Sequence, residues 1–276
     1  MRSLIYMLSS IIIAPLGGGN AQRWELGAQL AATGFMGDIN PTNPLYMKSV
    51  GGGMHLTYNF NPTWGIQSSY HYIHLKASDH DSNDPYRYAR RQYFDNNVHE
   101  LSFRANFNFF RFIAGGNPKR YTPYLFAGLA GFAHTPYIRL ENGVRYSLPK
   151  LKLQEDNRFK KIGMAVPFGF GFKYNMQGSW SIGAEIHYRV AFNDYLDNIS
   201  NRYPIHTTEP TGLPTELYHI QEANGRSLWQ ELAFPAGNIE NYAGKKKGNS
   251  RAQDGYMTAG VTVSYTLISR KCNWWN

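Results

Sequence analysis

The residues with the most chemical content lie at alternate positions of one segment, 180–190. Every even position there is apolar and every odd position is small, polar or charged, so Glu185, His187 and Arg189 share one face. Carboxylate, imidazole and guanidinium groups in this arrangement can serve acid–base catalysis, or they can form buried ion pairs. A period of two predicts a β-strand with one apolar and one polar face.

Residues 79–84, with the sequence DHDSND, resemble the beginning of a calcium-binding loop. An EF-hand requires Gly at its sixth position and Glu at its twelfth, where this chain has Asp84 and Arg90. An EF-hand is therefore excluded. A looser surface cation site stays open, but we expect an acidic, mobile external loop here.

Other candidate groups give weaker signals. His71 and His74 are three residues apart, which on a strand places them on opposite faces and makes them poor co-ligands. Ser264 and His187 should both point inward from neighbouring strands, but no acid partner and no nucleophile elbow accompany them. We therefore assign no catalytic residue, no cofactor and no metal ligand.

The period-two pattern recurs along the whole chain and predicts about eight strands. The expected strands cover 23–33, 49–60, 63–77, 96–112, 121–134, 161–175, 180–190 and 255–268. The strand at 121–134 is apolar on both faces, so its orientation stays ambiguous. Only 17% of residues are charged, and past the N-terminus no apolar run reaches the roughly 20 residues of a membrane-spanning helix.

The connections between these strands alternate in length. Tight turns fall near 61–63, 114–120 and 175–179, whereas the connections near 34–48, 78–95, 135–160 and 193–254 are long. Outer-membrane barrels have short periplasmic turns and long external loops. We therefore predict an all-β fold, an eight-stranded antiparallel transmembrane β-barrel in the bacterial outer membrane, with membrane lipid around it and both termini in the periplasm. A soluble barrel with an aromatic core is the alternative.

The chain divides into three expected parts. Residues 1–21 have the form of a secretory signal peptide, 22–268 form the barrel, and 269–276 form a periplasmic C-terminal tail. The single cysteine, Cys272, lies in that tail, where it is either idle or bonded to another chain. The net charge of +9 is spread over expected loops without a nucleic-acid-binding fold, so we expect no nucleic acid partner. Anionic headgroups or sugars could attract these loops, but solvated loops are the default.

The polar faces of the strands carry three acids and three bases. By depth, from the periplasmic end outward, they are Glu25 with Lys173, Arg104 with Glu185, and Glu100 with Arg189. An eight-stranded barrel has an interior just wide enough for side chains, and isolated charges there would be costly. We therefore predict a structural network of ion pairs that plugs the barrel. The glycines of 161–175 should make room for the long Arg and Lys side chains.

Several segments, in this order, resemble one known family. They are 37–42 (GDINPT), 58–62 (YNFNP), 107–110 (FNFF), 122–128 (TPYLFAG), 166–169 (VPFG), 171–174 (GFKY), 185–189 (EIHYR), 194–197 (DYLD) and 260–266 (GVTVSYT). This ordered set resembles the PorG-like outer-membrane proteins of Bacteroidetes. The resemblance implies a non-enzymatic barrel of the type IX secretion system, which exports proteins and in some species supports gliding motility. It also implies contact with a periplasmic ring of a PorK-like lipoprotein and a PorN-like protein.

From the topology we infer where such a partner would bind. The candidate contacts lie on the periplasmic turns and the tail: Asn61, Pro62, Asn117, Lys119, Arg120, Gln177, Arg270, Lys271, Cys272, Trp274 and Trp275. Two other functions stay open. One is a surface-interaction barrel whose long loops bind host or matrix ligands, and the other is a lipid-modifying hydrolase that uses Ser264.

Overall fold

In the computed structural model, the described residues are 23–268, apart from 42, 44, 116–118, 141–142, 156–158, 193, 200–201, 222–224, 238 and 249–252. The expected signal peptide and the C-terminal tail lie outside them. The same holds for Asn117, Arg270, Lys271, Cys272, Trp274 and Trp275. For these residues the expectations above stay predictions.

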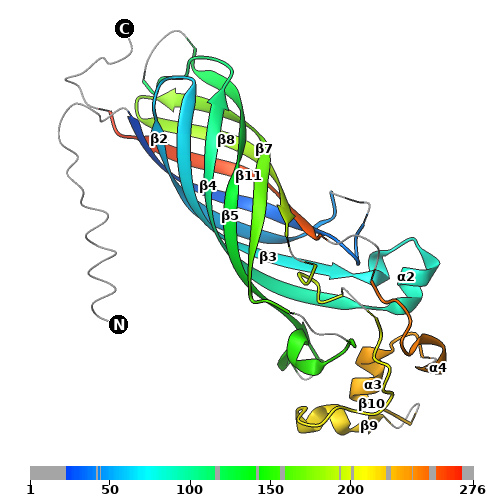
Figure 1. The fold of residues 1–276 in the computed structure, drawn as a ribbon. Coiled ribbons are helices and arrows are strands. Elements are labelled where there is room, and N and C mark those ends of the chain that lie inside the picture. Colours follow the sequence, from blue (N-terminus) through cyan, green and yellow to red (C-terminus); the bar gives the residue numbers. More distant parts are fainter. Residues whose placement is uncertain are drawn as a thin grey trace, which may run out of the picture.

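Eight long strands close into an antiparallel barrel (Figure 1). They are β1 (Trp24–Met36), β2 (Met47–Asn59), β3 (Trp64–Ser78), β4 (Tyr93–Asn108), β5 (Tyr121–Arg139), β7 (Ile162–Gln177), β8 (Trp180–Ala191) and β11 (Gly255–Thr266). Each strand pairs with the next one along the chain, and β11 pairs with β1 to complete the circle. This topology confirms the predicted fold class.

The outer wall of the barrel is apolar because the outward side of each strand carries the hydrophobic residues of the period-two pattern. Leu30, Met54, Leu129, Ile162 and Val261 are between 60% and 73% exposed. The inward positions are mainly polar and buried. This outer surface fits contact with the hydrocarbon core of a membrane, because soluble proteins rarely expose so continuous an apolar surface.

The structure settles the orientation of β5, whose two faces are both apolar in sequence. Leu125 and Leu129 point outward, whereas Tyr124, Phe126 and Phe132 are buried inside. The inward aromatic rings occupy space that a neighbouring strand leaves free.

That space comes from the glycines of β7. A Cβ at Gly163 would lie 2.5 Å from the ring of Phe132, and a Cβ at Gly171 would lie 2.4 Å from the ring of Tyr124. The expectation that these glycines make room for Arg and Lys side chains is therefore wrong. They accept aromatic rings of β5, the strand paired with β7.

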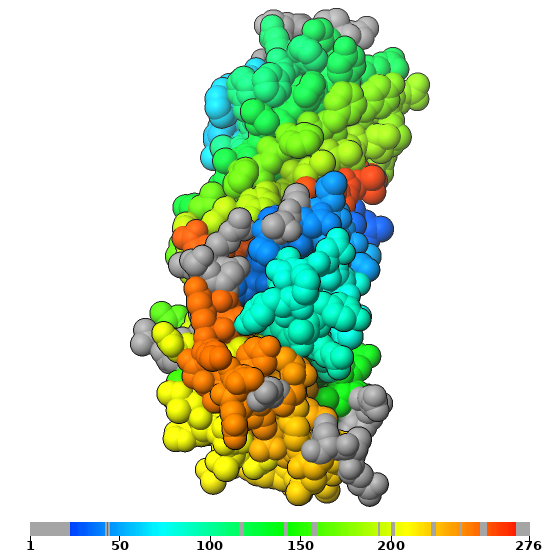
Figure 2. All heavy atoms as spheres, turned by 90° about the vertical axis from the view of Figure 1, so that its right-hand side faces the viewer, coloured from blue at the N-terminus to red at the C-terminus, as the bar shows by residue number. Residues whose placement is uncertain are grey.

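At the end of the barrel opposite the short turns, the long connections fold into a cap (Figures 1 and 2). The cap holds η2 (Asp79–Asp81), α2 (Pro85–Arg90), β6 (Arg145–Ser147), η3 (Leu148–Leu151), η4 (Thr215–Tyr218), β9 (Ile220–Gln221), β10 (Arg226–Ser227), α3 (Leu228–Ala233) and α4 (Ile239–Tyr242). Figure 2 shows the cyan segment around α2 packed beside the orange segment of the last long connection. Among the described residues, no helix is long and apolar enough to cross a membrane.

The cap has a hydrophobic core that continues from the cap-side ends of the strands. Trp229 of α3 is buried, and its indole N–H donates to the carbonyl of Leu151 at 2.9 Å. The ring of Tyr203 stacks on that of Phe234, with ring centres 5.8 Å apart. The long connections are thus folded structure with buried side chains of their own.

The segment 79–84 belongs to this folded cap, so the expectation of an acidic, mobile loop is wrong. Asp79 is fully buried, and Arg90 Nε lies 2.7 Å from its Oδ2. Asp84 caps α2 by accepting the N–H of Tyr86 at 2.9 Å. Two of the acids that suggested a cation loop therefore have structural partners inside the protein.

Candidate functional site: the charged barrel interior and its two rims

Six charged side chains point into the barrel and form three ion pairs. Their atoms are Lys173 Nζ and Glu25 Oε1 at 2.9 Å, Arg104 Nη2 and Glu185 Oε1 at 2.7 Å, and Arg189 Nε and Glu100 Oε2 at 2.7 Å. The partners are those that the predicted depths put together. All six side chains are at most 5% exposed, except Lys173 at 13%.

The middle pair lies at the centre of a hydrogen-bonded network. Both carboxylate oxygens of Glu185 accept from the Arg104 guanidinium, at 2.7 and 3.3 Å. Gln29 Nε2 donates to Glu185 at 3.1 Å, and the Tyr124 hydroxyl donates to it as well. The Arg104 guanidinium also lies 4.1 Å from the centre of the Phe126 ring. Glu185 is thus held from several strands at once.

The ion pair nearest the cap, Glu100 with Arg189, has a hydrogen-bonded network of its own. Glu100 accepts from the Tyr256 hydroxyl at 2.6 Å, and Arg189 Nη1 donates to Thr258 at 2.9 Å. His71 lies between the two layers, since its Nε2 is 3.0 Å from Gln29 Oε1 and its Nδ1 is 3.5 Å from Glu100 Oε1. The layers are therefore connected across the barrel.

Sequence reasoning did not assign a role to Gln29, Tyr124, His71 or Tyr256 in this network. Gln29 and Tyr256 were inward positions of period-two strands, so the pattern alone could have placed them. Tyr124 lies on β5, where the two apolar faces hid its direction. His71 is buried and His74 lies on the outer side, as their spacing predicts.

The interior geometry suits packing better than catalysis. Each of the three inward carboxylates is paired with a cation, which makes it a weaker base. Among the described residues, no three His, Cys, Asp or Glu side chains are arranged to hold a metal ion. The six buried charges instead fill the barrel at three levels.

The two residues considered for a hydrolase do not meet. β8 and β11 are paired as expected, but Ser264 lies opposite Ser181 whereas His187 lies opposite Thr258. Six residues of strand separate the two positions, which is roughly 20 Å. Ser264 and His187 therefore cannot form a nucleophile–base pair.

The rim formed by the short turns holds the candidate partner contacts. Asn61 is exposed, and its side-chain oxygen accepts the N–H groups of Thr63 and Trp64, both at 2.8 Å. Pro62 is buried, and its carbonyl accepts from Phe112 N–H and the Asn108 side chain, both at 3.1 Å. The assignment of Pro62 as a contact is therefore wrong, because its side chain faces the protein.

The other described rim residues are exposed. Lys119 projects over the ring of Phe110 at 3.9 Å, and Arg120 follows it at the start of β5. Gln177 lies where the register between β7 and β8 shifts. Lys119, Arg120, Gln177 and Asn61 thus present a polar, net basic edge on the side of the short turns.

The opposite rim gathers carboxylates from distant segments beneath the cap. Asp38, Asp197 and Asp254 are buried, and Asp194 is half-buried close to them. Asp197 accepts the N–H of Ile199, and Asp254 accepts the N–H of Leu196, both at 2.9 Å. The structure thus brings together residues from two of the sequence motifs, at 37–41 and 194–197.

Three of these carboxylates, Asp194, Asp197 and Asp254, have raised pKa values. Burial, then the charge of Asp38, raises the pKa of Asp197 well above its ordinary value. Burial, then the charge of Asp197, does the same to the pKa of Asp254. Burial and Asp38 raise the pKa of Asp194 to about 7. Beside them, burial and the charge of Arg90 lower the pKa of Lys247 to about 7.

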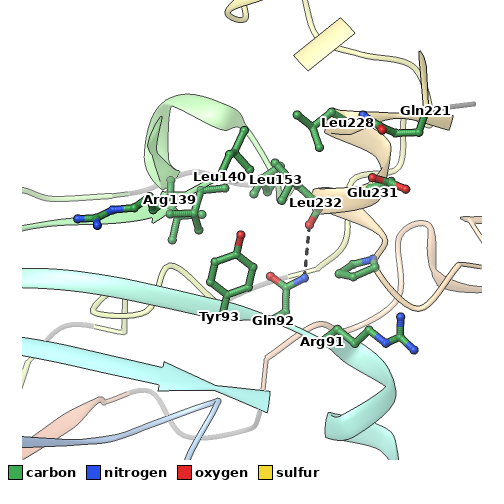
Figure 3. Close-up of a pocket in the computed structure, with 13 residues that line it drawn as sticks. Arg91, Gln92, Tyr93, Arg139, Leu140, Leu153, Gln221, Leu228, Glu231 and Leu232 are labelled. Atoms are coloured by element: carbon green, nitrogen blue, oxygen red, sulfur yellow. Dashed lines mark hydrogen bonds between the residues drawn. The ribbon is translucent and has the colours of Figure 1, made fainter. Parts of the chain in front are cut away.

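A hollow of about 450 Å³ lies between α3 and the cap-side ends of β4 and β5, at the beginning of β4 and the end of β5 (Figure 3). Leucine is the most frequent residue in its lining, which also has polar groups that include Arg91, Arg139 and Glu231. In Figure 3, Gln92 Nε2 donates to the carbonyl of Leu232 at 3.4 Å and thereby joins the chain at the beginning of β4 to α3. The hollow is a feature of the cap, outside the barrel interior.

A family model described as a domain of unknown function, DUF6089, matches residues 2–206. The chain belongs to this family. The match covers the strands β1 to β8 and therefore most of the barrel. No curated protein matches the chain.

Solved structures of outer-membrane barrels resemble this DUF6089 protein at low sequence identity. The N-terminal β-barrel domain of Pseudomonas aeruginosa OprF is 12% identical, with 88% of this chain and 97% of that chain covered and a TM-score of 0.39. Neisserial surface protein A is 11% identical, with 88% and 96% covered and a TM-score of 0.44. Pseudomonas aeruginosa OprG is 9% identical, with 91% and 99% covered and a TM-score of 0.41. At these identities the likeness concerns the fold alone.

Proposed function

We propose that this protein is a non-enzymatic outer-membrane barrel that anchors part of the type IX secretion machinery. The observation that carries the proposal is the closed, ion-paired interior beneath an apolar wall. Such a barrel is fixed in a membrane but offers its interior to no substrate. Its useful surfaces are therefore its two rims.

The proposed orientation follows from the length of the connections. The short turns face the periplasm and the cap faces outward, because outer-membrane barrels place short turns inside and long loops outside. Both termini then lie in the periplasm. The motif segments that resemble the PorG-like family support the assignment to type IX secretion.

The periplasmic rim is the proposed site of contact with the ring of PorK-like lipoprotein and PorN-like protein. Exposed Lys119 and Arg120 lie side by side there, with Asn61 and Gln177 on the neighbouring turns. Basic rim charges of this kind steer association with an acidic partner surface. The tail 269–276 would extend the same surface.

Affinity purification tests this proposal. A tagged barrel is recovered from native membranes in mild detergent, and the ring proteins that accompany it are quantified. Lys119→Glu with Arg120→Glu, or deletion of 270–276, should lower ring recovery several-fold. Lys150→Glu with Lys152→Glu, an equal charge change in the cap, should leave recovery unchanged. Full recovery with both rim variants would remove this rim from the contact.

Two further measurements test the role itself. Loss of the gene should abolish secretion of many unrelated proteins if the barrel anchors the export machinery. In planar bilayers the purified protein should give conductance close to background, because paired charges fill its interior. Large, regular conductance steps would contradict a plugged barrel.

A surface-interaction barrel is the second candidate, favoured by the folded cap. The long connections bury their own core and leave the hollow beside Tyr93 and Leu232. A ligand-binding loop region needs this kind of fixed surface. Loss of adhesion with intact secretion in the knockout would support this candidate over the first.

A further inference from the structure

The outward face of the barrel changes its chemistry just below the cap. Along β2 to β5, the side chains of Met54, Leu101 and Leu129 form part of the exposed apolar wall. Towards the cap end, the outward positions become Lys48 on β2 and Lys76 on β3. On β5 and the short strand β6 they become Arg139 and Arg145. The outward side chains thus change from apolar to cationic along the strands as these approach the cap.

A hollow of about 660 Å³ opens at this boundary. It forms because β2 and β3 separate: β2 begins at Met47 and β3 runs to Ser78, but their pairing stops at Gly51 and Ile73. The residues that matter here are Lys48, Tyr72, Lys76, Tyr137, Arg139 and Arg145. Figure 1 shows β2, β3, β4 and β5 running in the same wall of the barrel.

The cations in this hollow are poorly neutralised by the protein. Arg139 and Arg145 are directly opposite each other in the β5–β6 ladder, where like charges repel. Among the described residues, no carboxylate forms an ion pair with either of them or with Lys76. The one carboxylate in the lining, Asp95, lies 3.3 Å from His74 Nε2. Lys48 is 3.7 Å from Asp81, in a pair too exposed to count for much.

Aromatic groups complete the surface. The Arg145 guanidinium lies 5.1 Å from the centre of the Tyr137 ring, and Tyr72 stands beside His99 with ring centres 5.2 Å apart. Tyrosines with an apolar body and a polar tip settle at the level of lipid headgroups. Tyrosines, free cations and an adjoining hydrocarbon wall together fit an anionic amphiphile.

We propose that this hollow binds the phosphate groups of an anionic glycolipid in the outer leaflet. Lys76, Arg139 and Arg145 hold the phosphates, and the acyl chains lie along Met54, Leu101 and Leu129. The proposal rests on the outward orientation of the cap that the proposed function includes. It adds a lipid-binding site that secretion itself does not require.

The test uses the full mature chain in neutral detergent micelles and a fluorescent diphosphoryl lipid A as probe. Changing Lys76, Arg139 and Arg145 together to Gln should raise the Kd for the lipid at least tenfold at 0.15 M salt. Each cation near an anionic lipid contributes to binding. A control triple, Lys150→Gln, Lys152→Gln and Lys161→Gln, removes the same charge from exposed cap positions. Its Kd should stay within twofold of the parent.

Three results would overturn the proposal. They are equal losses in the two triples, equal binding of the dephosphorylated lipid by the parent, and competition by inorganic phosphate or a soluble phosphorylated disaccharide at the affinity of the lipid. The last result would indicate a site for soluble phosphates. If the triple does not fold, as judged by its mobility on unheated gels, Arg145→Gln alone should still weaken binding about threefold. Ring recovery, measured separately, tells failure of this proposal from failure of the secretion role.

Discussion

Arg189 and Glu100 lie 2.7 Å apart at Nε and Oε2, both fully buried, although 89 positions separate them in the chain (189 − 100). One projects from β8 and the other from β4, on opposite arcs of the barrel. The pair therefore joins two walls that share no backbone hydrogen bond. A charge pair at this depth fixes how the barrel closes.

Replacing Glu100 by Gln should destabilise the barrel strongly. The change leaves the Arg189 guanidinium buried without a counter-charge, which costs about 3–5 kcal/mol. The measurement is urea unfolding of the barrel in lipid vesicles, followed by tryptophan fluorescence. Glu25→Gln is the matched control, because its partner Lys173 is 13% exposed and can reach water. We expect a loss of only about 1–2 kcal/mol there, and equal losses would contradict the role assigned to depth.

The contacts of the β7 glycines with the inward aromatic rings of β5 predict that one substitution restores the stability lost by another. Gly163→Ala brings a methyl group within 2.5 Å of the Phe132 ring and should cost about 1–3 kcal/mol. Adding Phe132→Leu should recover much of that loss, since the shorter side chain frees the space. Gly131→Ala is the control, because nothing lies within 4 Å of its Cβ position. The unfolding free energies of these three variants and of the parent in one lipid decide the matter. A double variant less stable than Gly163→Ala would exclude this explanation.

The carboxylates beneath the cap predict that the cap loosens as the pH rises. The pKa of Asp194 is raised from 3.8 to about 7, so the folded form holds its proton more tightly than the unfolded form. This contribution is fully present below pH 3.8 and is lost as the pH rises through about 7. Asp197 and Asp254 act in the same direction. Lys247 acts in the opposite direction: its pKa is lowered from 10.5 to about 7, so its cost to stability is full below about pH 7 and is relieved as the pH rises above it.

Limited proteolysis within 192–254 measures this effect. Cleavage should be slower at pH 5 than at pH 8, and Asp194→Asn should reduce the difference. The variant should gain about 1–2 kcal/mol of local stability at pH 8, after allowance for the partial exposure of the carboxyl. Comparison of variant with parent removes the contributions of the histidines and of Lys247. Identical pH profiles would show that Asp194 does not carry the dependence.

The barrel strands were predictable because each one has an environment with two distinct sides. Lipid on one side and a polar interior on the other impose the period of two, so residues 180–190 alone indicate the pattern. The pairing of Glu185 with Arg104 followed from depth. The orientation of β5 was not predictable from that strand, because Phe132 and Tyr124 point inward only where glycines of β7 receive them.

The cap was beyond prediction for a different reason. Helices α3 and α4 have six and four residues, too short to form without tertiary packing. The burial of Trp229 against the carbonyl of Leu151 holds α3 in place, and those residues are far apart in sequence. No periodic pattern of apolar residues in the sequence predicts such long-range contacts. The capping box of Ser227 and Gln230 was the one local signal for α3 in the sequence.

Arg90 occupies the position at which a calcium loop would have its final Glu, and the structure gives it another task. Its guanidinium binds both oxygens of Asp79, at 2.7 and 2.8 Å, and donates to the carbonyls of Asp38 and Lys247, both at 3.0 Å. Arg90 thus ties three segments of the cap together. Arg90→Met should leave Asp79 buried and unpaired and cost about 3–5 kcal/mol.

Proteolysis of the cap and calorimetric titration with calcium check this prediction together. Arg90→Met should accelerate cleavage in 79–92 and 202–248, whereas the parent should give no calcium heat because Asp79 is already paired. Arg87→Met on the same helix is the control. Its ion pair with Asp84 is longer, at 3.4 Å, and Asp84 is 45% exposed, so its loss should destabilise the cap far less. Equal sensitivity of the two variants would mean that helix α2 as a whole, and not the buried Arg90 contact, holds the cap.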